Sequence, residues 1–188
     1  MKILNVGCGG NRPVKEPWIN IDNLHAIFPD LTRPERKNMD AEFNYLNADL
    51  RNGIPFENDS VEGILASHFL EHLDTQESLK FLRECLRVLK SGGILRLSVP
   101  DPAKFYKLTI EGCTNWGEPN PYTDRTFMEF ALFFGEHKQL VGIDALNCML
   151  NVVGFKTWYE TTSSTTHLLP LADIDNRAIF SLFVEASK

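Results

Sequence analysis

The chain has 188 residues, of which 43% are hydrophobic and 23% charged, a composition typical of one ordinary globular domain. Its formal net charge of -6 opposes binding to a phosphate backbone, so nucleic acid is not an expected partner. No apolar run approaches the roughly 20 residues that a membrane span requires.

The cysteines and the first residues indicate the cellular compartment. The segment Met1–Val6 predicts a strand rather than a signal peptide. The four cysteines lie far apart and form no CxxC pair: they are Cys8, Cys85, Cys113 and Cys148. This argues against a zinc knuckle or a disulfide framework and suits a reducing environment. We therefore expect a cytoplasmic protein and, because neither a repeat nor a linker divides the sequence, a single domain over residues 1–188.

The first strand, predicted at Ile3–Val6, leads directly into Gly7-Cys8-Gly9-Gly10-Asn11. Glycines at the end of a strand allow positive φ angles and let a ligand approach the backbone without a Cβ in the way. Tight turns also use glycine, so this loop alone is a weak indication of a ligand site. Pro13 and Pro17 exclude a full helix between the loop and the next strand.

The second and third predicted strands are each followed by a carboxylate. Asp22 follows Trp18–Ile21, and Asp49 comes shortly after Asn44–Asn47. In doubly wound folds an acid at the second strand end accepts hydrogen bonds from ribose hydroxyls. The second acid suits the exocyclic amine of an adenine. Either acid alone is compatible with a turn or a helix cap, but a glycine loop and two acids in order predict a nucleoside-containing ligand.

The fourth strand, predicted at Gly63–Ser67, leads into His68-Phe69-Leu70-Glu71-His72. This run matches the H-x-x-E-H pattern of inverted zinc peptidases. Such a zinc site needs both histidines on one helical face, whereas here the strand places His68 at its end and His72 in the following turn. We therefore expect no metal site in this chain. His68 and Phe69 are expected to line the ligand cavity, and Glu71 with His72 to organise the turn.

The clearest helix is predicted from Thr75 to Lys90, and the fifth strand follows at Ile94–Val99. Leucines recur at helical spacing along it: Leu79, Leu82, Leu86 and Leu89. Asp74 and Glu77 resemble a capping box, and Ser91-Gly92-Gly93 supplies a stop. The basic residues of this helix are expected on its solvated outer face.

After the fifth strand the sequence predicts an aromatic-rich insertion at about 102–140, with two short helices around a loop at Gly112–Pro121. A second long helix is predicted at about Asp144–Val153. The last two strands, Phe155–Glu160 and Ala178–Glu185, have no helical pattern between them. They are therefore expected to pair as antiparallel neighbours.

These motifs resemble those of class I methyltransferases dependent on S-adenosylmethionine (SAM), over nearly the whole chain. Leu4–Gly10 is similar to the first motif of that family, and Asp22 and Asp49 to its ribose-binding and adenine-contacting acids. Asp59–Leu73 is similar to the fourth-strand region, and Leu86–Gly93 to the turn before the fifth strand. The short proline-containing crossing departs from the common pattern and resembles predicted methyltransferases of glycan or cell-surface pathways.

The resemblance implies an α/β, Rossmann-like class I methyltransferase fold, with a seven-stranded, mostly parallel sheet of order 3-2-1-4-5-7-6 and an antiparallel last strand. It implies SAM as the cofactor and methyl transfer to a small-molecule acceptor. The acidic charge, the aromatic insertion and the resemblance together favour a sugar or glycan precursor. The expected cofactor contacts are Gly7, Cys8, Gly9, Gly10, Asn11, Asp22, Asn23, Asp49, Leu50, His68 and Phe69.

The catalytic candidates lie beyond the ends of the fourth and fifth strands, where the acceptor is expected. A sulfonium already activates the methyl group, so the main task of the protein is to place the acceptor. A hydroxyl acceptor would also need a base, for which His68, Asp101 and His137 are the candidates. For Asp101 a cap on the next helix is favoured, and for His137 an exposed loop position is an equal alternative.

Two other functions share these motifs. A nicotinamide dinucleotide enzyme uses G-x-G-x-x-G, but Arg12 stands at the third glycine and proline interrupts the following helix. SAM has no pyrophosphate that needs this helix N-terminus, so the departure favours SAM. A non-catalytic SAM-binding module would carry the same cofactor residues, and the sequence does not distinguish it from an enzyme.

Overall fold

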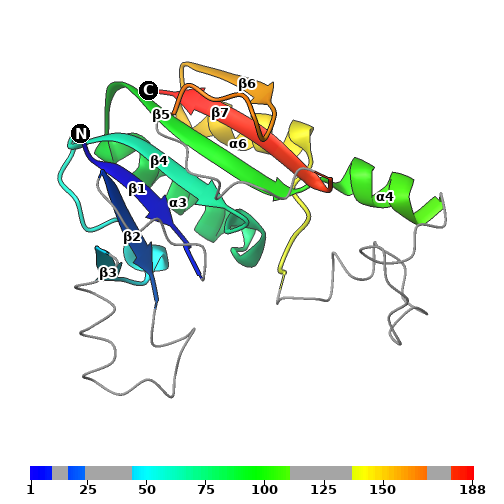
Figure 1. Ribbon diagram of the computed structural model, residues 1–188, viewed down its shortest axis with the longest axis horizontal. Helices are drawn as coiled ribbons and strands as arrows, with labels where there is room; N and C mark the ends of the chain where they lie inside the picture. The colour runs from blue at the N-terminus through cyan, green and yellow to red at the C-terminus, as the bar shows by residue number, and fades with distance from the viewer. Residues whose placement is uncertain (10–16, 24–43, 111–136, 169–178) are drawn as a thin grey trace.

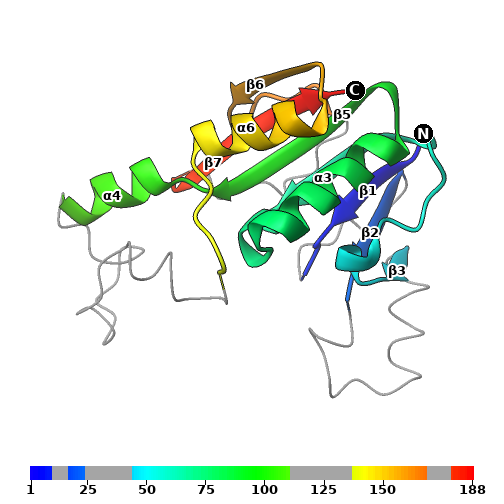
Figure 2. The ribbon, with the colours of Figure 1, turned by 180° about the vertical axis from the view of Figure 1, so that it is seen from behind.

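The computed structural model describes residues 1–9, 17–23, 44–110, 137–168 and 179–188. They form one sheet with the helices α3 and α6 on one of its faces (Figures 1 and 2). Residues 10–16 of the predicted proline-containing crossing lie outside the described residues, as does the centre of the predicted insertion, Gly112–Pro121.

The sheet has seven strands in the order β3-β2-β1-β4-β5-β7-β6, which confirms the predicted order. The neighbours from β3 through β5 run parallel, whereas β7 is antiparallel to both β5 and β6. The strands are β1 Ile3–Val6, β2 Trp18–Asp22, β3 Tyr45–Asn47, β4 Val61–Ser67, β5 Leu89–Pro100, β6 Thr157–Thr161 and β7 Ser181–Ser187.

The helices between these strands are short. They are α3 Thr75–Val88, α4 Pro102–Ile110 and α6 Ile143–Val153, with single 3-10 turns η1 at Leu50–Asn52 and η2 at Leu70–His72. In the described part of the chain, none of the helices has the length and apolarity needed to cross a membrane.

Helix α3 begins as predicted and ends earlier than predicted. Its capping box is formed, because the Glu77 N–H donates to Asp74 Oδ1 at 2.8 Å and the Asp74 N–H donates to Glu77 Oε2 at 2.9 Å. The helix stops at Val88 rather than Lys90, since Leu89 takes extended backbone and pairs with Val61. The predicted glycine stop therefore lies within β5.

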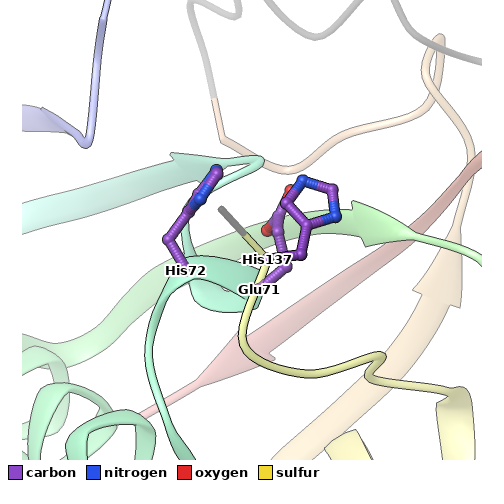
Figure 3. Close-up of side chains that lie close together, drawn as sticks. All are labelled: Glu71, His72 and His137. Carbon is purple, nitrogen blue, oxygen red and sulfur yellow. The ribbon is translucent and has the colours of Figure 1, made fainter. Parts of the chain in front are cut away.

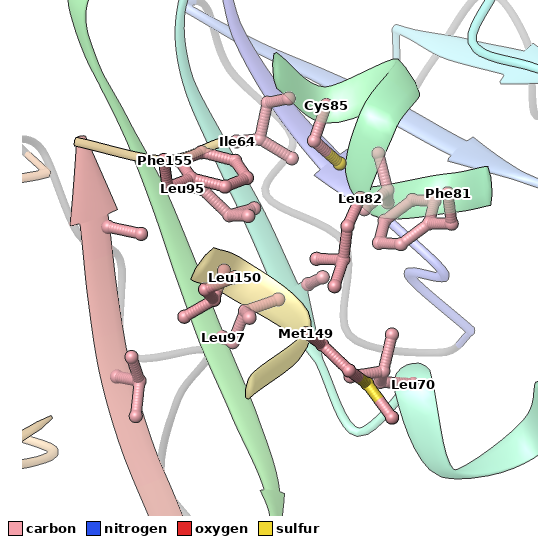
Figure 4. Packing of buried hydrophobic residues seen from close by; sticks show 14 of the residues in the cluster. Ile64, Leu70, Phe81, Leu82, Cys85, Leu95, Leu97, Met149, Leu150 and Phe155 are labelled. Carbon is pink, nitrogen blue, oxygen red and sulfur yellow. The ribbon is translucent and has the colours of Figure 1, made fainter. Parts of the chain in front are cut away.

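The core lies between the sheet and the two helices on its covered face (Figure 4). Alternate strand residues such as Leu4, Ile64 and Leu95 face Leu82 and Leu150 of the helices in a single buried cluster. Each such side chain stabilises the fold by about 1.5–3 kcal/mol when it is fully buried.

The opposite face of the sheet is more polar. Arg96 and Glu185, both fully buried, form an ion pair at 3.0 Å. The Arg96 guanidinium also donates to the carbonyls of Thr162 and Thr165, at 2.8 and 3.0 Å. The segment after β6 is thereby held against this face, where Leu168 completes a small apolar cluster.

The carboxyl ends of the parallel strands meet at one edge of the sheet. In the register, Val6 lies beside both Ile21 and Ala66, and Asp22 lies beside Asn47. The turns η1 and η2 and the start of α4 all follow strands at this edge (Figure 1). Side chains in these connections can therefore act on one ligand.

Candidate functional site

The glycine loop after β1 closes against an aromatic ring. Gly7 has a φ of +64° and Gly9 a φ of +48°, both in the left-handed region that favours glycine. A Cβ on Gly7 would lie 2.3 Å from Cδ2 of Phe69, so no larger residue fits without a shift. A Cβ on Gly9 would meet no described heavy atom within 4 Å, so this glycine has an open side.

Asp22 joins the second strand to the glycine loop. Its Oδ2 accepts a hydrogen bond from the Gly9 N–H at 2.9 Å, and its Oδ1 accepts one from the Asn23 N–H at 2.7 Å. An ionised carboxylate accepts about four hydrogen bonds, so these two bonds from described residues fill about half of that capacity. Two features that the sequence places 13 residues apart are thus in direct contact.

Asp49 follows β3, the neighbour of β2, and caps η1. It accepts from the backbone N–H of Arg51 at 3.1 Å and from the Arg51 guanidinium at 2.7 to 3.2 Å. The Arg51 side chain holds the pKa of Asp49 below its ordinary value, although partial burial acts in the opposite direction. Asp49 is therefore a fixed, ionised acceptor at the same edge as Asp22.

The remaining expected cofactor contacts differ in what they can offer. The side chain of Leu50 belongs to the hydrophobic core, so a ligand at this position would meet its backbone. Cys8 is also buried. Gly10 and Asn11 lie outside the described residues.

His68 sits at the end of β4 in a conformation unusual for a residue with a side chain. Its φ is +53°, and its N–H donates to the Ser98 carbonyl at 2.9 Å. Its Nδ1 lies 3.0 Å from Glu71 Oε1 and its Nε2 lies 2.7 Å from Ser181 Oγ. Both ring nitrogens are thus engaged, and the side chain is only 8% exposed. Ser181 has no local sequence signal, because it lies 113 residues away.

Asp101 follows β5 and caps α4, the alternative that the sequence favours. Its Oδ1 accepts from the backbone N–H of Ala103 at 2.9 Å and, more weakly, from that of Lys104 at 3.4 Å. Its own N–H donates to the Phe180 carbonyl at 2.8 Å. The cap fixes the start of α4 at the edge of the sheet, and a role as a base stays a prediction.

His137 lies in an irregular segment that packs against η2, and it is half-buried rather than exposed. Its ring meets the ring of His72 edge to face, with 4.9 Å between the centroids. The next residue, Lys138, donates its backbone N–H to the Glu71 carbonyl at 2.8 Å. Figure 3 shows Glu71, His72 and His137 side by side. No sequence pattern predicts the contact between His72 and His137, because the two residues lie 65 positions apart.

Comparison with known proteins places this arrangement in one family. The family described as "Methyltransferase domain" matches residues 4–97, which is half of the chain. The match runs from β1 through most of β5 and includes the glycine loop, both strand-end acids and η2. No curated protein matches the chain at significant similarity.

Solved structures share the fold at low sequence identity. A SAM-dependent methyltransferase from Archaeoglobus fulgidus is 19% identical, with a TM-score of 0.63 over 100% of this chain and 86% of its own. A SAM-dependent methyltransferase from Aquifex aeolicus is 17% identical, with a TM-score of 0.57 and coverage of 99% and 81%. A Haloferax volcanii protein solved in complex with the methyltransferase activator Trm112 is 13% identical, with a TM-score of 0.60 and coverage of 99% and 81%.

Proposed function

This chain belongs to the methyltransferase-domain family of SAM-dependent enzymes, and we propose that it methylates a small-molecule acceptor, with a sugar or glycan precursor as the favoured class. The observation that supports the cofactor half of this proposal is the bond between Gly9 and Asp22. This bond holds the Gly9 backbone beside the carboxylate that we propose to bind the ribose.

The residues that would hold SAM follow from this geometry. The backbone of Gly7, Cys8 and Gly9 would approach the ligand, Asp22 and Asn23 the ribose, and Asp49 with the Leu50 backbone the adenine. The ring of Phe69, which packs against Gly7, would support the glycine loop. His68 completes the proposed set, together with Gly10 and Asn11, which lie outside the described residues.

When bound, SAM supplies a methyl group made electrophilic by the attached sulfonium. The chain itself must position the acceptor in line with this methyl group and exclude water. We propose that the acceptor lies beyond the ends of β4 and β5, next to His68, Asp101 and His137. We propose that His68 and Asp101 keep this edge in shape through their bonds to Ser181 and to the start of α4.

The acceptor side of the proposal also rests on the predicted insertion. We propose that the chain is one domain over residues 1–188, with the insertion at about 102–140 next to the acceptor. Helix α4 begins this stretch and starts directly from the sheet edge. The acidic net charge of -6 further favours a small molecule over a nucleic acid as the acceptor.

A thermal-shift comparison tests the cofactor, and a transfer assay tests the reaction. S-adenosylhomocysteine should raise the melting temperature because it binds only the folded protein, whereas NADH should leave it unchanged. SAM carrying a labelled methyl group should then transfer label to a member of a panel of sugars and glycan precursors. Stabilisation by NADH alone would overturn the cofactor assignment. Label transfer to protein or RNA but to no small molecule would overturn the acceptor class.

A further inference from the structure

The segment before α6 is fixed to the turn η2 by several hydrogen bonds. The backbone N–H groups of Lys138 and Gln139 both point to the Glu71 carbonyl, at 2.8 and 3.4 Å. The Gln139 side chain donates to the Leu70 carbonyl at 3.1 Å and to Ser78 Oγ at 2.7 Å. Two segments far apart in sequence are therefore held together by contacts that do not involve His72 or His137.

This juxtaposition brings three metal-ligating side chains together. One carboxylate oxygen of Glu71 and one ring nitrogen each of His72 and His137 lie within 4.8 Å of one another (Figure 3). We propose that these three residues bind a divalent transition-metal ion, with Zn²⁺ the best match to the ligand set. Two imidazoles and one carboxylate are a known set for zinc and for other first-row metals.

A second and independent observation concerns the carboxylate of Glu71. The residue is 1% exposed, and its Oε1 faces Nδ1 of His68 at 3.0 Å. Its Oε2 is buried and has no hydrogen-bond partner among the described residues. A buried carboxylate oxygen without a partner is costly, because the charge has lost its hydration. A cation at the cluster would compensate for that loss.

The geometry requires only small movements of the side chains. Ligand atoms around a tetrahedral ion at 2.0–2.2 Å lie about 3.3–3.6 Å apart, so atoms that are now within 4.8 Å of one another must close by up to about 1.5 Å. Rotation of the His72 and His137 rings can supply this movement, because both side chains are only partly buried. Glu71 would remain fixed by its bond to His68, which orients the carboxylate as an outer ligand partner does in metal sites.

The proposed site is not the one that the H-x-x-E-H pattern predicts. That pattern would use His68 and His72 as the two histidine ligands. Both ring nitrogens of His68, however, already face Glu71 and Ser181. In the proposed site the second histidine ligand is His137, which comes from another segment of the chain. His137 would then act as a ligand rather than as the predicted base.

Three protein ligands leave coordination positions open. Glu71 and His72 follow β4, which pairs with β1, so the ion would lie at the sheet edge that also carries the glycine loop. An acceptor hydroxyl bound there would have a lowered pKa, as does metal-bound water. This last step rests on the proposed function, whereas the metal site itself does not.

The test is a metal titration of the full chain after removal of bound metals with EDTA. Calorimetry with Zn²⁺ should show one tight equivalent, and Co²⁺ should give the visible absorption of a site with imidazole ligands. His72→Ala and His137→Ala should each weaken Zn²⁺ binding by at least about 100-fold, because even outer-shell changes cost about 10–100-fold. His167→Ala, at a histidine in a different part of the fold, should bind Zn²⁺ like the unaltered chain.

Several outcomes would overturn the metal site. They are the absence of saturable binding by the unaltered chain, unchanged affinity in His137→Ala, or an equal loss in His167→Ala. His137 is the decisive position because its replacement leaves the backbone bonds to Glu71 in place.

S-adenosylhomocysteine binding, measured on the same metal-free protein, separates the proposed metal site from the proposed function. Retained nucleoside binding without metal binding refutes the metal site alone, and loss of both in a folded chain refutes the proposed function as well.

Discussion

At Gly7 the backbone conformation and one aromatic ring together leave no room for a side chain. The left-handed φ costs a residue with a Cβ about 1–2 kcal/mol, and the ring of Phe69 occupies the place of that Cβ. The same ring contacts Phe81 of α3, with 5.0 Å between the centroids. The position of the glycine loop is therefore coupled to the helix beneath the sheet.

We predict that Gly7→Ala lowers the free energy of unfolding by more than 2 kcal/mol, because backbone strain and a steric clash add. In a Phe69→Ala background the same change should cost only about 1 kcal/mol, since the clash is gone. Urea denaturation of the four proteins measures both costs. Equal costs in the two backgrounds would show that Phe69 does not restrict this position.

The sequence predicts the residues of the glycine loop and the two acids, because each belongs to a short motif at a strand end. It does not predict the partner of His68, since Ser181 lies on the last strand and no local pattern connects the two. The contact between His72 and His137 cannot be predicted from the sequence for the same reason. Contacts between segments far apart in sequence depend on how the strands are arranged in the sheet, so they are recognised only in the structure.

Among the helices and strands, α3 shows the clearest agreement between the sequence pattern and the structure. Its capping box is a local feature, so the sequence defines the start at Thr75. The predicted leucine stripe is right only in part, because the buried face carries Phe81, Leu82 and Cys85, whereas Leu79 and Leu86 are half-buried beside it. Its end depends on a distant residue, because Leu89 leaves the helix to pair with Val61 of β4. Helix ends of this kind cannot be predicted from the helix alone.

We expect Asp74→Ala to destabilise the protein by about 1 kcal/mol, because the Glu77 N–H loses its acceptor at the N-terminus of α3. Gln76→Ala, an exposed position in the same turn, should change the stability by less than about 0.5 kcal/mol. Chemical denaturation of both variants measures the difference. A cost of Gln76→Ala equal to that of Asp74→Ala would contradict a specific role for the cap.

At the scale of the whole molecule, the two faces of the sheet are stabilised by different means. The covered face has an apolar core, whereas the other combines a small apolar cluster with the buried pair of Arg96 and Glu185. Burial raises the pKa of Glu185, but hydrogen bonds from Thr166, Tyr159, the His167 N–H and Arg96 outweigh it and bring the pKa to about 2. The predicted strand order identifies neither this pair nor its role, because alternation alone does not show which polar residues are buried.

Glu185 gives the stability a defined dependence on pH. Because its pKa is lowered from 4.5 to about 2 on folding, its contribution is complete above pH 4.5 and is lost as the pH falls toward 2. Glu185→Gln should cost about 3–5 kcal/mol at neutral pH, since it leaves Arg96 buried without its counter-ion. It should also flatten the loss of stability below pH 4.5.

The control for this variant is Glu160→Gln, at an exposed carboxylate on the edge strand β6. It should keep both the stability and the acid slope of the unaltered chain. Thermal denaturation from pH 7 to pH 2 measures all three proteins. An acid slope that is unchanged by Glu185→Gln would assign the pH dependence to other groups.

We propose that the glycine loop and Asp22 together bind the adenosyl part of SAM. Calorimetric titration with S-adenosylhomocysteine tests it most directly, with Asp22→Ala compared with Asp144→Ala, an exposed carboxylate on α6. Hydrogen bonds to a charged group contribute about 1.5–3 kcal/mol each. Asp22→Ala should therefore bind at least about tenfold more weakly while still folded, whereas Asp144→Ala should match the unaltered chain. Equal affinity of Asp22→Ala and the unaltered chain would contradict the account.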